Sequence, residues 1–191
     1  MFVVNLALKN MKFIIPLFAL VLLASCKDQQ KVKYLNELQV MEKQLDSLDL
    51  VANDTTGEVP FNINMSVRNT ILKVKNNYLP DTIDYAVADM MNDYKEIRKV
   101  LSKNGKNLEK VNQAIPEVKQ KVKDLYHDIE NGAGERERYR EYVDFEKSKI
   151  ENIKDVLSYY VDTKNKYFNR YDSLHPIVSN FADSLVNAQI D

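Results

Sequence analysis

Apolar residues recur every three or four positions along residues 28–188, the spacing that places them on one face of an α-helix. Glycine, proline and short polar runs divide this pattern into four segments, which predict helices over about 28–53, 62–79, 81–131 and 135–188. The alternation typical of β-strands is missing from the pattern. The predicted fold class is therefore all-α: a helical bundle built on a long antiparallel coiled-coil hairpin (about 81–131 and 135–188) with two shorter N-terminal helices.

The third and fourth segments keep a 4-3 heptad spacing over their whole length. In the fourth, thirteen of the fifteen heptad positions are apolar or aromatic, and the two exceptions are Glu146 and Lys164. A short loop with Gly132 and Gly134 joins the two segments, which makes them antiparallel neighbours. Pairing the segments about this loop places Asn104 opposite Lys164, so that two polar positions share one layer of the seam.

The hairpin has one alternative. A tight turn at residues 103–107, which contain an Asn-Gly pair, would split the third segment and give a compact five-helix bundle. The heptad phase continues through Gly105, which favours one helix, although a turn does not require the phase to change. Pro116 and Pro176 are expected to bend the helices that contain them.

The two shorter helices are expected to pack on the hairpin end that holds residues 81–104 and 164–188. The other end, tipped by the charged run 135–141, would then project as a two-helix arm. Asp81 or Thr82, just after a proline, is expected to cap the third helix.

Composition excludes several functions. One cysteine among 191 residues cannot form an internal disulfide or a Cys-ligated cluster, and four glycines form no phosphate-binding motif. A net charge of −1, from 27 basic and 28 acidic residues, argues against a nucleic-acid partner. No residue order points to a nucleophile, so we predict no enzymatic activity and no cofactor.

The N-terminal region carries an export signal. Met11-Lys12 precedes the apolar run Phe13–Leu23, which is shorter than the ~20 residues that span a bilayer. Leu23-Ala24-Ser25-Cys26 follows at once and resembles the lipobox of bacterial lipoproteins.

The resemblance implies that residues 1–25 are a signal peptide and that Cys26 becomes an acylated (palmitate-bearing) N-terminus. The mature region, 26–191, would then be a single helical domain whose membrane partner is reached through the Cys26 lipid anchor. In this family an aspartate after the cysteine favours the inner membrane. Lys27 stands there instead, so the outer membrane is expected.

The two histidines share a motif, since His127 and His175 each follow an aspartate by three residues. That spacing places two ligands on one helix face, as in di-iron bundles. The hairpin register separates the two motifs, and neither histidine lies on the seam. Both are expected to be exposed, and no metal site is predicted.

Aromatic residues gather in the fourth segment around one lysine. Their hydroxyls would reach the helix edge if the rings were core, but a ring-and-cation cluster is also the best candidate for partner binding. The candidate residues are Tyr160, Lys164, Tyr167 and Tyr171.

Five Asp-Ser or Asp-Thr pairs, each followed by an aliphatic residue or threonine, resemble an O-glycosylation sequon used on exported proteins by one phylum of Gram-negative bacteria. Such pairs also start helices, which explains Thr82 well. Thr55 is the first candidate because it lies in a predicted loop. The full set is Thr55, Ser47, Thr82, Ser173 and Ser184.

Together these features predict an envelope lipoprotein that acts as a non-catalytic structural or adaptor module. Its protein partner is unidentified, and a second copy of the chain is one candidate. The alternative is a holdase-type periplasmic chaperone or carrier that binds a client between its helices.

Overall fold

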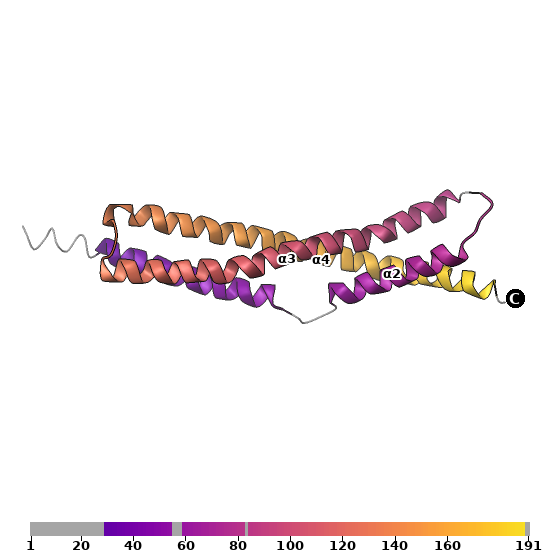
Figure 1. Ribbon diagram of the computed structural model, residues 1–191, viewed down its shortest axis with the longest axis horizontal. Helices are drawn as coiled ribbons and strands as arrows, with labels where there is room; N and C mark the ends of the chain where they lie inside the picture. Colours follow the sequence, from indigo (N-terminus) through magenta and orange to yellow (C-terminus); the bar gives the residue numbers. More distant parts are fainter. Residues whose placement is uncertain (1–28, 55–58, 83, 190–191) are drawn as a thin grey trace, which may run out of the picture. The chain divides into compact units, whose positions relative to one another are not determined.

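The computed structural model describes residues 29–54, 59–82 and 84–189, which contain helices and no strands. The all-α prediction is confirmed, and the two long helices pair as the predicted hairpin (Figure 1). The elements are a helix over residues 29–52, α2 (Pro60–Asn77), α3 (Tyr85–Asn131), the short 3-10 helix η1 (Arg136–Arg138) and α4 (Tyr139–Asn187).

The chain divides into two compact units. One combines the chain up to Leu45 with Glu117–Ile150, and the other combines Asp46–Pro116 with Glu151–Asp191. We call them the first and second units. Each contains one stretch of α3 and one of α4.

In the first unit the N-terminal helix packs against the hairpin. Its buried stripe of Leu38, Met41 and Leu45 is at most 4% exposed. Polar contacts flank this stripe: Lys31 Nζ donates to the Glu130 main-chain oxygen at 2.6 Å. Further contacts are the pairs Gln39–Tyr126, Glu42–Lys123 and Glu37–Arg140. The expected bare arm at this end is therefore wrong, because the first helix buries its apolar stripe here.

The second unit is a three-helix core. Its main cluster of buried apolar residues draws on α2, α3 and α4 in similar numbers: Ile63, Val67, Val74, Met91, Tyr94, Ile97, Leu101, Tyr167, Tyr171, Val178 and Ala182. Most belong to the predicted heptad stripes, so the periodicity identified the buried faces correctly. Of the two outermost heptad positions that the apolar spacing gives for the hairpin, Ile83 lies outside the described residues and Ala188 is exposed.

The predicted pairing of Asn104 with Lys164 is not observed. Asn104 is 3% exposed, and its Nδ2 donates to the main-chain oxygen of Tyr160 at 2.9 Å. The expected partner was Lys164, four residues further on, which is about one helical turn. Lys164 instead places its Nζ 5.9 Å from the centre of the Tyr160 ring. The Asn104 amide is therefore satisfied by the main-chain carbonyl of Tyr160 and by Asn107, whose Nδ2 donates to Asn104 Oδ1 at 3.3 Å.

α3 runs without interruption through Gly105 and Pro116, so the tight turn at 103–107 is excluded. The turn lies instead after Asn131. Gly132, with φ +69°, donates its N–H to Ile129, and the next N–H, from Ala133, reaches the Asp128 oxygen at 2.7 Å. These two bonds form a Schellman motif, in which glycine adopts the left-handed conformation without strain.

The start of α3 also differs from expectation. Asp84 Oδ1 accepts the main-chain N–H groups of Ala86, at 2.9 Å, and Val87, at 3.3 Å. Asp84, rather than Asp81 or Thr82, therefore caps the helix. None of the helices in the described part of the chain has an apolar stretch long enough to cross a bilayer.

Gly105→Ala should stabilise the protein by roughly 0.5–1 kcal/mol, because glycine inside a helix costs conformational entropy. A Cβ built at Gly105 meets nothing within 4 Å. Gly132→Ala should have the opposite effect, costing about 1 kcal/mol, since its positive φ disfavours any Cβ. Urea unfolding of both variants measures the difference, and a destabilised Gly105→Ala would contradict the continuous helix.

Candidate functional site

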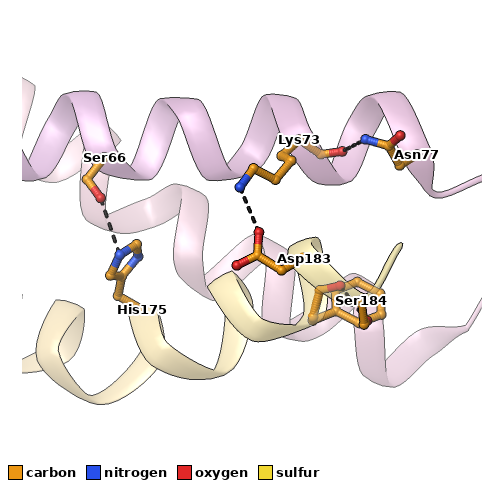
Figure 2. A network of polar contacts seen from close by, with 7 residues as sticks. Ser66, Lys73, Asn77, His175, Asp183 and Ser184 are labelled. Atoms are coloured by element: carbon orange, nitrogen blue, oxygen red, sulfur yellow. Dashed lines mark hydrogen bonds and ion pairs between the residues drawn. The ribbon is translucent and has the colours of Figure 1, made fainter. Parts of the chain in front are cut away.

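The densest set of polar contacts in the second unit joins all three of its helices. Tyr94 on α3 and His175 on α4 are 2.5 Å apart, from hydroxyl to Nδ1. The other ring nitrogen of His175 lies 3.4 Å from Ser66 Oγ on α2, and Tyr171 donates its hydroxyl to the same Ser66 oxygen at 2.9 Å. Figure 2 shows the Ser66–His175 contact bridging α2 and α4. We call these four residues the interhelical network.

Ring stacking holds His175 in place. Its ring is stacked on Tyr171, with centroids 4.6 Å apart and planes 15° apart, and it lies parallel to the ring of Tyr94 at 6.0 Å. The expectation that His175 is exposed is therefore wrong. It follows Leu174, a heptad position of the fourth predicted helix, by one residue, and contacts with α2 and α3 leave this flanking position only partly exposed. His127 is exposed, as expected, with 70% of its side chain accessible.

Burial favours the neutral form of one network residue, Tyr94. It raises the pKa of Tyr94 to about 12, with a smaller contribution from Tyr171 and an opposing one from a hydrogen bond with Thr70. Tyr94 is 0% exposed and stays a neutral phenol at physiological pH. The network combines a hydroxyl with an imidazole, but Ser66 also accepts a hydrogen bond from Tyr171. The network therefore connects α2, α3 and α4 through side-chain hydrogen bonds.

A second polar cluster joins α3 and α4 near the network. The Arg170 guanidinium contacts Asp93 Oδ1 and Glu96 Oε2, each at 2.8 Å. Tyr167 donates its hydroxyl to the other Glu96 oxygen at 3.1 Å. Burial raises the pKa of Tyr167, and the hydrogen bond and charge of Glu96 raise it further. One arginine thereby connects two acidic side chains of the neighbouring helix, a geometry that suits its planar fork.

The predicted partner-binding residues are mostly interior. Tyr160, Tyr167 and Tyr171 are each less than 10% exposed, and Lys164 is half-buried. Burial raises the pKa of Tyr160. The exposed aromatic ring of this stretch is Tyr159, at 62%. These tyrosines thus serve the core, and contact between this stretch and a partner stays a prediction.

The candidate modification sites fall into two groups. Cys26 and Thr55 lie outside the described residues. Ser47, Thr82, Ser173 and Ser184 are all exposed. Ser173 and Ser184 donate their hydroxyls to the main-chain oxygens of Asn169 and Phe181, at 2.9 and 2.7 Å. Ser184 and the nearby Lys73–Asp183 ion pair are drawn in Figure 2.

Glu146 is the buried polar residue of the first unit. It is 7% exposed and occupies the seam position predicted from the heptads. One carboxylate oxygen accepts a hydrogen bond from Lys149 at 3.2 Å, while the buried Oε2 has no partner among the described residues. It lines a hollow of about 390 Å³ with Asp124, Asp128 and Tyr142. Among residues 29–54, 59–82 and 84–189, no three or more acidic, histidine or cysteine side chains are grouped as metal ligands.

No protein-family model, curated protein or solved structure matches this chain. The helices of the described region define the class of protein as an all-α helical bundle.

Tyr94→Phe should lower the free energy of unfolding at pH 7 by about 1–3 kcal/mol, since His175 loses a buried hydrogen-bond partner. The variant should also be less sensitive to alkali. The raised pKa means that the contribution of Tyr94 is complete below pH 10 and is lost as pH rises towards about 12. Denaturant titrations at pH 7, 10 and about 12 measure both effects.

The control for Tyr94→Phe is Tyr159→Phe, because Tyr159 is 62% exposed. It should leave both the stability and its pH dependence unchanged. Equal alkaline sensitivity of the wild type and Tyr94→Phe would contradict the assigned role of Tyr94.

Glu146→Leu should stabilise the protein by about 1 kcal/mol, because a buried carboxylate oxygen without a partner carries an uncompensated desolvation cost. Glu151→Leu is the matched control on an exposed position of α4 and should change little. Thermal and urea unfolding compare the two. A Glu146→Leu variant less stable than Glu151→Leu would show that the carboxylate contributes favourably to the fold.

Proposed function

We propose that the protein is a lipid-anchored envelope protein whose helical region is a structural or adaptor module. The observation that carries this proposal is the sequence Leu23-Ala24-Ser25-Cys26 placed directly after an apolar run. Such a site would attach acyl chains at Cys26, and more than one chain gives stable membrane anchoring. Lys27 favours the outer membrane.

The packing of the mature region supports an adaptor role. In each unit the apolar stripes of the helices pack against one another. The polar groups at these helix–helix contacts mostly form hydrogen bonds or ion pairs between helices. A partner would then be met by outward-facing side chains on the helices and by the connecting loops. Arg138 at the hairpin turn and Tyr159 on α4 are suited to such contacts because both are exposed. The Arg138 side chain is 47% accessible, and Tyr159 as a whole residue is 62% exposed.

A client-binding carrier is the second candidate. It is favoured by two large apolar side chains on either side of the connection between α2 and α3, Leu79 at 83% exposed and Tyr85 at 78%. Suppression of aggregation of a denatured test protein by the purified chain would favour the carrier over the adaptor.

Cys26→Ala should release the protein from the membrane fraction, because no acyl chain can be attached. Lys27→Asp tests the choice of membrane: the protein should stay membrane-bound but move to the inner membrane. Sucrose-gradient fractionation and intact mass measure both. An unmodified wild-type mass, or a membrane-bound Cys26→Ala variant, would overturn the anchor.

The adaptor role has its own test in intact cells. A photoreactive amino acid at Arg138 or Tyr159 should give discrete crosslinked species of higher mass, identified by pull-down. The matched control is the buried Val143, 0% exposed, where the same group should give no intermolecular adduct. Absence of any discrete adduct from the exposed positions would contradict an adaptor.

A further inference from the structure

A hollow of about 340 Å³ lies in the second unit, between the C-terminal half of α2, the connection to α3 and the first turns of α3. Its walls are mainly apolar: Ile71, Val74, Tyr78, Pro80, Val87, Ala88 and Met91. The volume is at the lower end of small-molecule sites, which span roughly 300–1,000 Å³ and are largely apolar with a few polar groups. The hollow is too small to hold an α-helix of a partner, because a helix with its side chains is ~10–12 Å across.

The polar groups of the hollow carry an excess of positive charge. Lys75, Lys95 and Asp84 line it. Asp84 is engaged in capping α3, where it accepts the N–H groups of Ala86 and Val87. Within the described residues neither lysine forms an ion pair, whereas the nearby Lys73 pairs with Asp183 at 2.7 Å. Two cations without partners therefore lie beside an apolar hollow.

The approach to the hollow is apolar as well. Leu79 and Tyr85 are 83% and 78% exposed, and each neighbours a lining residue, Pro80 or Asp84, in sequence. Exposed apolar side chains next to a hollow of the same character mark a ligand site more specifically than single exposed residues elsewhere.

We propose that this hollow binds a free single-chain amphiphile with an anionic head, of the fatty-acid class. The hydrocarbon chain packs against Val74, Val87 and Met91, and the carboxylate is held by Lys75 and Lys95. The small volume favours one chain over the two of a phospholipid. This inference does not depend on the Cys26 anchor or on a protein partner, and it can fail or hold independently of the proposed function.

The test uses the full chain in phosphatidylcholine nanodiscs with a photoactivatable diazirine analogue of lauric acid. Peptide mapping by mass spectrometry should place the adducts on lining residues such as Met91 and Val87. Excess laurate should abolish labelling, and dodecyltrimethylammonium, which carries the opposite head-group charge, should compete at least tenfold less well. Equal competition by both amphiphiles would overturn the role of the lysines.

Two variants and a control complete the experiment. Lys75→Glu/Lys95→Glu should weaken laurate competition at least tenfold. Lys99→Glu/Lys103→Glu makes the same charge change at exposed positions of α3 outside the hollow and should bind as the wild type.

Ala88→Leu fills the hollow without changing charge and should reduce labelling of its walls, with melting temperature as the check on folding. Adducts scattered along the helices would overturn the site. So would protection of the hollow by a second protein copy but not by laurate.

Discussion

The burial of one continuous apolar stripe on each long helix is the constraint on which the structure depends. A helix as long as α3 exposes such a stripe along its entire length unless another helix covers it, and covering it is the main favourable term in folding. In both units α3 and α4 cover each other, and a third helix covers the groove between them. The apolar spacing thereby determines which face of each helix is buried.

Polar groups inside these seams follow a different rule, because each must find a partner when water is removed. Asn104 finds a main-chain carbonyl, and Tyr94 finds the imidazole of His175. Both connections fix one helix against another at a particular register, which an apolar stripe alone does not. Glu146 is the exception, since one of its oxygens is buried without a partner. Polar residues between the helices therefore specify how the helices align in this protein. The desolvation cost of burying them differs from one residue to the next.

The sequence was sufficient to predict the helices and their buried faces, because a 3.5-residue repeat is a property of local spacing. It was not sufficient to predict which part of the hairpin the first helix covers. The stripe of Leu38, Met41 and Leu45 indicates that this face of the helix is buried, but it does not indicate which part of the hairpin covers it. The predicted pairing of Asn104 with Lys164 was wrong because the Asn104 amide bonds to a main-chain carbonyl, a contact that a pattern of side chains does not reveal. His175 was wrongly expected to be exposed because heptad positions counted for a pair of helices leave out contacts with a third helix.

The same distinction explains why the hollow near Lys75 and Lys95 has no signature in the sequence. Two lysines twenty residues apart look like ordinary solvated charges, of the kind that pair with acids on a helix surface. Their significance comes from the connection between α2 and α3, which brings the end of one helix near the start of the next and leaves space between them. Asp84 is the acidic residue of that lining, and it already caps α3. A binding site of this kind depends on how the connection between two helices is shaped and on which charged side chains beside it lack ion-pair partners. Such a site therefore forms where regular helix packing ends.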